Sequence, residues 1–228
     1  MQTFLDLSSV EFIDIHTHSP SNRRGVFSLQ SLFLKDAENA PLNFFSCGVH
    51  PWYVSESYPS TKFYQSPVFK RKELIAVGEI GLDKVNNKVN YNLQIEVFKT
   101  QLILAEQLKK PVIIHSVKAY SDVLAILKKT QPTVPLIFHG YNENMQIADQ
   151  LLNFNSYFSF GQFLFRTNSK AVNVFSQIPE NKLFLETDDS LFSISEVYEK
   201  ATEIRSLKLN DLQGLIADNF RKVFAIND

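Results

Sequence analysis

The chain has little of several residues that mark special protein classes. Among its 228 residues there is one cysteine, which excludes an internal disulfide framework and a zinc ribbon. Seven glycines and nine prolines are too few for a disordered or low-complexity protein. The remainder, 44% apolar and 21% charged, is ordinary for a soluble globular protein, and we expect a single domain over residues 1–228.

The sequence also lacks long apolar runs and an excess of either charge. Its longest apolar runs, such as residues 74–78, are too short to span a bilayer. The first residues place no basic residue before their apolar ones and include Asp6, so we expect no signal peptide, no membrane and a cytoplasmic location. A net charge of −1 gives no global electrostatic reason to bind nucleic acid. Binding of nucleic acid would require a local basic patch.

Short apolar runs alternate with segments of helical period, which predicts an α/β fold. The runs are apolar on both faces, as in parallel strands covered by helices. Eight such runs favour a compact (β/α)8 TIM barrel, near the lower limit of about 200 residues for that fold. The expected strands are Glu11–Ile15, Val26–Leu32, Asn43–Val49, Leu74–Gly78, Val112–Ile114, Leu136–Phe138, Tyr157–Phe160 and Leu183–Leu185. The expected helices cover Asn92–Lys110, Ser121–Lys129, Asn144–Asn153, a segment around 172–178 and two segments within 197–223.

Histidines and acids stand at the ends of five of the eight expected strands. In a parallel barrel these ends lie on one face, so the side chains would meet in one pocket. Each residue alone is better explained as ordinary structure, but four of the five histidines fall in such places, and two acids complete a mixed nitrogen and oxygen set. The candidate metal ligands are His16, His18, Glu79, His115, His139 and Asp188.

Four imidazoles and two carboxylates exceed what one tetrahedral ion needs. A site for two divalent metal ions is the economical interpretation, because such a pair stabilises the attacking and leaving oxygens of a hydrolysis. The mixed ligands suit Zn or Mn and do not exclude Mg, and the sequence does not choose among them.

Several motifs resemble those of the TatD-like metal-dependent deoxyribonucleases of the amidohydrolase superfamily. They run from residue 11 to residue 224, nearly the whole chain, and the most specific pair is GEIGLD with ETD. The motifs are FIDIHTH, GVHPW, AVGEIGLD, PVIIHS, FHGY, LFLETD and NFRKVF.

The resemblance implies a role for each matching residue. His16, His18 and Asp188 would hold one metal, and His115 with His139 would hold the second. Glu79 would bridge the two. Asp188 would also take a proton from the metal-activated water, which makes Asp188 and Glu79 the catalytic candidates. The implied activity is hydrolysis of phosphodiester bonds, with DNA or a small phosphoester as substrate. No protein partner can be inferred.

The departures from the family pattern concern substrate recognition. The family commonly has an Arg-Asp pair after the histidine of the fifth strand, where this chain has Val117 and Lys118. An aromatic pair usually follows GLD, where Lys84 and Val85 stand here, and the loop after Asp188 is shortened. These differences leave the metal ligands intact.

Loop cations and aromatics near the expected site are the candidates for substrate contact. We expect at least one of these cations to contact a substrate phosphate, although each one taken alone is equally well explained as a solvated loop charge. His50 would either contact substrate or orient another residue, and Trp52 and Tyr53 would lie at the pocket rim. The cations are Arg23, Arg24, Lys118 and Arg166.

Two other functions remain open on the sequence alone. One keeps the metal hydrolase and changes the substrate to an ester, lactone or amide of a small molecule, because fold does not settle function. The other is a non-catalytic binding protein with a vestigial metal site, against which the intact set of six ligands argues.

Overall fold

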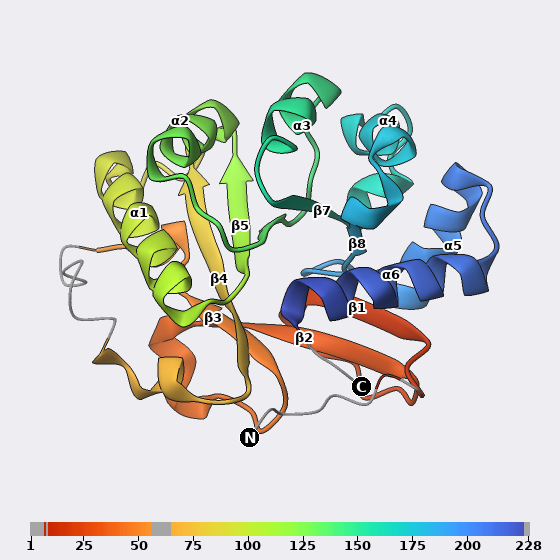
Figure 1. The fold of residues 1–228 in the computed structure, drawn as a ribbon, viewed down its shortest axis with the longest axis horizontal. Helices are drawn as coiled ribbons and strands as arrows, with labels where there is room; N and C mark the ends of the chain where they lie inside the picture. Colours follow the sequence, from red (N-terminus) through yellow and green to blue (C-terminus); the bar gives the residue numbers. More distant parts are fainter. Residues whose placement is uncertain (1–6, 8, 56–64, 226–228) are drawn as a thin grey trace. The chain divides into compact units, whose positions relative to one another are not determined.

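The computed structural model describes residues 7, 9–55 and 65–225. Its eight strands form one sheet whose order follows the chain, and every pair with a defined register is parallel. Figure 1 shows the ribbon with most of the strands and helices labelled. Thr17 and Asp188 add a parallel bridge between the first strand and the residues after the last, so the order closes on itself and the predicted α/β barrel is confirmed. The strands are β1 Phe12–Thr17, β2 Val26–Phe33, β3 Phe45–Gly48, β4 Leu74–Asp83, β5 Val112–Val117, β6 Leu136–Phe138, β7 Ser156–Phe160 and β8 Leu183–Leu185.

Helices follow the later strands, as the periodicity predicts. Asn90 caps α1 by accepting the backbone N–H groups of Asn92 and Leu93, and Ser193 with Glu196 forms a capping box at the start of α5. In the described part of the chain, no helix is long and apolar enough to cross a membrane. The helices are α1 Tyr91–Leu108, α2 Tyr120–Thr130, α3 Met145–Leu151, α4 Lys170–Gln177, α5 Ile194–Arg205 and α6 Leu209–Phe224.

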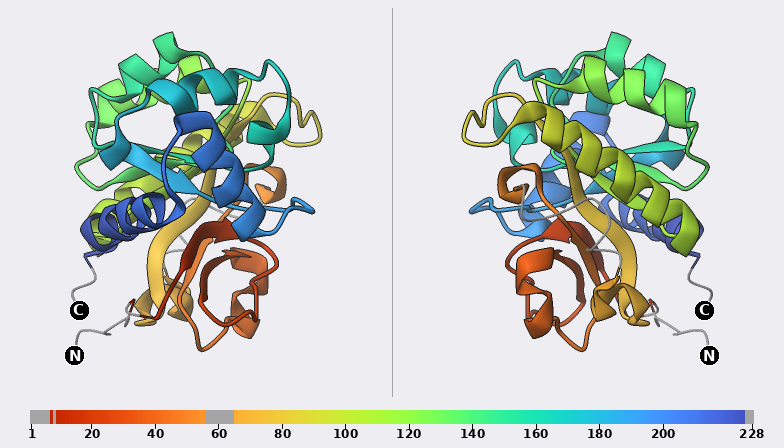
Figure 2. Two further views of the ribbon diagram at one scale, coloured as in Figure 1. Left: turned by 90° about the vertical axis from the view of Figure 1, so that its right-hand side faces the viewer. Right: turned by 90° about the vertical axis from the view of Figure 1, so that its left-hand side faces the viewer.

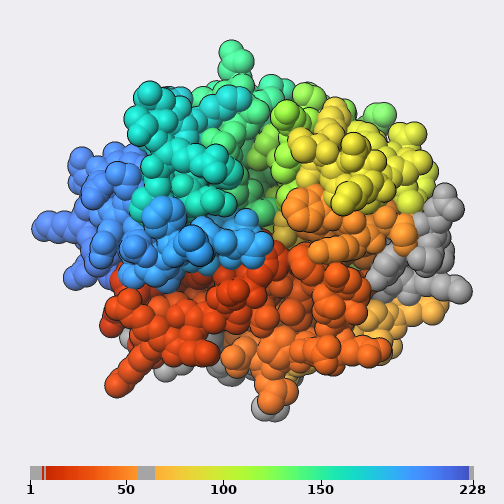
Figure 3. Space-filling model, turned by 180° about the vertical axis from the view of Figure 1, so that it is seen from behind, coloured from red at the N-terminus to blue at the C-terminus, as the bar shows by residue number. Residues whose placement is uncertain are grey.

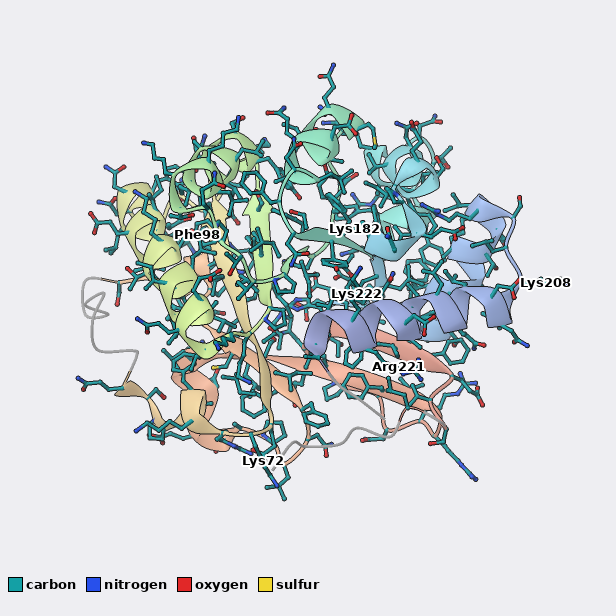
Figure 4. All side chains as sticks on the ribbon, viewed as in Figure 1. Lys72, Phe98, Lys182, Lys208, Arg221 and Lys222 are labelled. Carbon is teal, nitrogen blue, oxygen red and sulfur yellow. The ribbon has the colours of Figure 1, made fainter. Side chains whose placement is uncertain are left out.

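The chain divides into two compact units. The first unit draws its described residues from 1–30, 139–152 and 156–228, and the second from 31–138 and 153–155. In the first, α5 and α6 pack on β1 and β8, and the ring of Phe220 on α6 contacts the rings of Phe27 and Phe224. In the second, α1 lies along β4 (Figure 2), and its Phe98, labelled in Figure 4, is buried.

Strand β4 is longer than the sequence predicts, and this changes where the candidate ligands stand. The apolar run ends at Gly78, yet the strand continues to Asp83 because its later residues pair with β5, Gly81 with His115 and Asp83 with Val117. Glu79 and His115 therefore lie inside strands rather than after them, as does His16 in β1, which corrects the expectation that these residues follow strand ends.

Gly81 shows how closely β4 and β5 approach beside the site. Its φ is +149°, and a Cβ atom built there would lie 1.9 Å from the carbonyl oxygen of His115. A side chain is therefore excluded at this position, which explains the second glycine of GEIGLD.

Candidate metal centre

In the first unit, three histidines and one aspartate form a compact group, which we call the His16 cluster: His16, His18, His139 and Asp188. The Nε2 atoms of His16 and His18 lie 3.6 Å and 3.7 Å from Oδ1 of Asp188. The His16 and His139 rings are 4.3 Å apart between centroids. His16 is fully buried, whereas the side chain of Asp188 is 28% exposed and reaches solvent.

The backbone holds Asp188 in an uncommon conformation. Its φ is +53°, in the left-handed region, where aspartate is tolerated better than most residues. Its N–H donates to the carbonyl oxygen of His16 at 2.9 Å, and Oγ1 of Thr17 donates to its carbonyl oxygen at 3.3 Å. Two contacts with β1 thus fix a residue whose backbone conformation carries strain, a combination common at functional sites.

Asp14 holds the segment that carries Asp188 through contacts with Thr187. Its carboxylate accepts the backbone N–H of Thr187 at 3.0 Å and the Thr187 hydroxyl at 2.7 Å. Burial raises the pKa of Asp14 to about 7, although the bonds from Thr187 work in the opposite direction. The sequence analysis did not select Asp14, but the two-residue spacing of Asp14 and His16 places both on one face of β1, and His18 follows at the same spacing directly after the strand.

Glu186 is a second acid that the sequence analysis did not select. It is 1% exposed, its Oε1 accepts the N–H of Gly140 at 2.6 Å, and the same oxygen lies 3.6 Å from Nδ1 of His139. The signal that could have identified it is its place two residues before Asp188 in the motif LFLETD. Its carboxylate therefore lies beside His139.

In the second unit, two histidines and two acids form another group, which we call the Glu79 cluster: His50, Glu79, Asp83 and His115. Oε1 of Glu79 lies 2.6 Å from Nδ1 of His115 and 3.2 Å from Nε2 of His50. All four residues are buried. Nδ1 of His50 accepts the backbone N–H of Trp52, so a neutral His50 carries its proton on Nε2 and donates it toward Glu79.

Asp83 accepts several hydrogen bonds within and beside the Glu79 cluster. Burial alone would raise its pKa, but hydrogen bonds from His115, Trp52 and the backbone of Val85 and Asn86 hold the pKa well below its usual range. Asp83 is therefore a carboxylate at neutral pH.

The donor atoms of both groups fit divalent metals. One ligand atom each from His16, His139 and Asp188 lies within 4.8 Å of the others, and the same holds for His50, Glu79 and His115. Imidazole nitrogen with carboxylate oxygen is the donor set of many Zn and Mn sites.

A pocket of about 310 Å³ lies beside Asp188 in the first unit. Its walls are β1, the segment after it and the loop after β8, which Figure 3 shows as the red and light-blue segments lying against each other. Among the cations proposed for substrate contact, Arg23 lines this pocket, and its Nη1 lies 3.2 Å from Oγ of Ser195. The short loop after Asp188 thus forms a wall of the pocket.

The other proposed substrate contacts lie in different settings. Arg24 is exposed on the segment after β1. Lys118, directly after β5, is exposed and has a φ of +50°. Arg166 is exposed with its guanidinium 4.7 Å from the ring centre of Phe163. Trp52 is 49% exposed.

Comparison with known protein families gives one clear match. The family model described as TatD-related DNase matches residues 27–225. A relative from Bacillus subtilis named "Uncharacterized metal-dependent hydrolase YabD" is 29% identical, over 68% of this chain and 67% of that protein. A relative from Escherichia coli, "Uncharacterized metal-dependent hydrolase YcfH", is 27% identical over 80% and 74% of the two chains.

Solved structures share the fold. The crystal structure of YjjV, a TatD homologue from Escherichia coli, aligns with a TM-score of 0.82 over 95% of this chain and 99% of its own, at 22% identity. Dihydroorotase from Saccharomyces cerevisiae aligns with a TM-score of 0.60 over 98% and 86%, at 11% identity. At these identities the similarity establishes the architecture alone.

Proposed function

Because this chain belongs to the TatD-related DNase family of metal-dependent hydrolases, we propose that it cleaves phosphodiester bonds, with DNA or a small phosphoester as substrate. The observation that carries this proposal is the His16 cluster, where two imidazole nitrogens face one carboxylate oxygen beside an open pocket. Such ligands hold a divalent ion, and the pocket gives a substrate access to it.

We assign the metal ligands as the family pattern implies. His16, His18 and Asp188 would hold one ion, His115 and His139 would hold the other, and Glu79 would be shared. The support for a single centre is the family pattern. The same reasoning makes residues 1–228 one catalytic domain.

The chain's own residues then carry distinct steps. Bound metals would lower the pKa of a water molecule and stabilise charge developing on the phosphate. Asp188 accepts the proton of the attacking water, which its partial exposure and its place in the pocket wall permit. Asp14 and Glu186 hold Thr187 and His139 in place around it.

The proposed substrate contact is a phosphate held by Arg23. Its guanidinium lines the pocket that Asp188 also lines, and guanidinium groups bind phosphate oxygens in a bidentate manner. Arg24, Lys118 and Arg166 are exposed, and they are candidates for contact with the other phosphates of a longer substrate. Charge reversal at Arg23 should therefore weaken turnover more than charge reversal at Arg24, and it should reduce the salt dependence of binding. Unchanged turnover and salt dependence after reversal of all four cations would contradict this assignment.

The experiment is hydrolysis of a labelled single-stranded oligodeoxynucleotide and of bis(p-nitrophenyl) phosphate by protein reconstituted with Mn²⁺. We expect Asp188→Asn and Glu79→Gln to lower the rate by about 10²- to 10⁴-fold, the usual contribution of acid–base groups. Asp122→Asn, which alters an acid on α2, is the control and should leave the rate unchanged. Phosphodiester cleavage that persists in both site variants would overturn the proposal.

A second candidate is hydrolysis of a small-molecule ester, lactone or amide. The pocket volume favours it, because 310 Å³ is at the lower end of the range for small-molecule sites. Metal-loaded protein that is inactive on both phosphodiesters but active on a panel of lactones and amides, with loss of activity in Asp188→Asn, would establish this alternative.

A further inference from the structure

Asp83, at the end of β4, joins two different kinds of donor. Its Oδ1 accepts the backbone N–H groups of Val85 at 2.7 Å and Asn86 at 3.1 Å. Its Oδ2 accepts the indole N–H of Trp52 at 2.6 Å and lies 3.4 Å from Nε2 of His115. One oxygen therefore secures the turn after the strand, and the other lies between an aromatic side chain and a candidate metal ligand.

We propose that Asp83 and Trp52 are positioning residues that fix the orientation and tautomer of His115. With Asp83 ionised and bonded to Nε2, the imidazole keeps a proton on Nε2, and Nδ1 shares a proton with Glu79 or, when a metal is bound, would give its lone pair to the ion. Nδ1 is the nitrogen that faces Glu79, at 2.6 Å. The inference rests on the proposed function in one respect: it assigns Nδ1 of His115 as the atom that meets the metal.

Trp52 holds Asp83 in place and supports a second histidine as well. Its indole N–H donates to Asp83, while its backbone N–H donates to Nδ1 of His50 at 3.1 Å. His50 in turn directs Nε2 toward Glu79. A single half-exposed residue thus contributes to the orientation of both imidazoles in the Glu79 cluster.

These contacts give Asp83 and Trp52 separable effects. A carboxylate behind a metal-binding histidine makes the ligand more basic and restricts its rotation, and loss of such a partner costs about 10- to 100-fold in metal affinity. Loss of the indole N–H leaves the Asp83–His115 contact in place, so its effect should be smaller. The single tryptophan of the chain lies at this network and provides a fluorescence signal for it.

The decisive variant is Asp83→Asn. The asparagine oxygen can still accept the N–H groups of Val85 and Asn86, whereas its NH₂ group cannot accept from Trp52 or His115. Trp52→Phe removes the indole donor and keeps an aromatic ring. Asp122→Asn is the matched control, because Asp122 also accepts from an aromatic side chain, that of Tyr91, and no described contact joins it to a histidine.

Two measurements test the proposal. In titrations of each full-length protein with Zn²⁺ against a competing chelator, we expect Asp83→Asn to lower the affinity of one site by about 10- to 100-fold, Trp52→Phe to lower it less, and Asp122→Asn to leave it unchanged. In metal-free protein, nitrogen NMR shifts should report a proton on Nε2 of His115, and Asp83→Asn should lower the fraction of His115 that is protonated there. We also expect Zn²⁺ to change Trp52 emission in the wild type and to change it less in Asp83→Asn.

The outcomes separate this inference from the proposed function. If Zn²⁺ binds nowhere in the wild type, the proposed metal function fails, while the tautomer measurement still decides the role of Asp83. A folded Asp83→Asn protein with unchanged His115 tautomer and unchanged Zn²⁺ affinity would overturn the positioning role. An unfolded Asp83→Asn protein shifts the decision to Trp52→Phe, in which an unchanged His115 tautomer and affinity would overturn it.

Discussion

The backbone N–H of Asp188 donates to the carbonyl oxygen of His16 at 2.9 Å. These two candidate ligands are 172 positions apart in the sequence, and a main-chain bond joins them where the first and last strands meet. The position of the Asp188 carboxylate relative to His16 is therefore set by the closure of the strand order and not by side-chain packing alone.

This relationship predicts different outcomes for two substitutions at Asp188. Asparagine tolerates a positive φ as aspartate does, whereas alanine there costs about 1 kcal/mol of additional backbone strain. We expect both variants to lose metal, as measured by elemental analysis, and only Asp188→Ala to show a lower Tm in the metal-free state. Equal loss of Tm in both variants would show that the carboxylate itself is needed for folding.

Gly81 and Gly214 form a contrasting pair. A Cβ at Gly81 would collide with the His115 carbonyl at 1.9 Å, so Gly81→Ala should unfold the protein or displace β4 from β5. Gly214 lies within α6 with nothing within 4 Å of a built Cβ, and Gly214→Ala should raise the free energy of unfolding by about 0.5–1 kcal/mol. Urea denaturation measures both, and a neutral Gly81→Ala would contradict the close approach of the two strands.

Glu106 makes part of the stability pH-dependent. Its carboxylate accepts the backbone N–H groups of Thr133 and Val134 at 2.6 Å and 2.9 Å. Burial opposes ionisation, but these bonds and the Thr133 hydroxyl lower the pKa of Glu106 below its ordinary 4.5. A lowered pKa in the folded state stabilises the protein above the ordinary value, and the contribution is lost as the pH falls through the folded pKa.

Glu106→Gln should therefore lower the free energy of unfolding at pH 7 by about 1 kcal/mol, the size of one such hydrogen bond. The difference from wild type should shrink as the pH falls below 4.5 and through the lower pKa of the folded state, below which both proteins carry a neutral side chain. Denaturation of the two proteins at pH 7 and at acidic pH is the measurement. A difference that stays constant over this range would exclude the charge of Glu106 as its source.

Removal of metal should destabilise the protein. A ligand that binds only the folded state at 100 times its Kd adds about 2.7 kcal/mol of stability, so a chelator should lower the Tm of reconstituted protein by several degrees. The Tm of Asp188→Asn should respond less, because that variant lacks one ligand. A chelator that leaves the wild-type Tm unchanged would argue against stabilisation of the folded protein by a bound ion.

The sequence alone predicted the eight strands, the helices and the six candidate ligands. Parallel strands buried on both faces must be apolar throughout, so each strand stands out as a Val-, Ile- or Phe-rich run, and a histidine or acid that interrupts such a run is conspicuous. The prediction failed at the end of β4, where Glu79 ends the apolar run although the strand continues. A buried polar side chain that faces a site cannot be distinguished from a strand end by hydropathy.

Tertiary structure alone decided which supporting residues surround those ligands. Asp14, Asp83 and Glu186 lie within the motifs FIDIHTH, GEIGLD and LFLETD, but their roles follow from contacts with Thr187, Trp52 and His139. The contacts with Thr187 and Trp52 join residues 173 and 31 positions apart. Residue type and strand spacing determine which side chains can bind a metal, but hydrogen-bond partners depend on distances and angles that only the folded backbone sets.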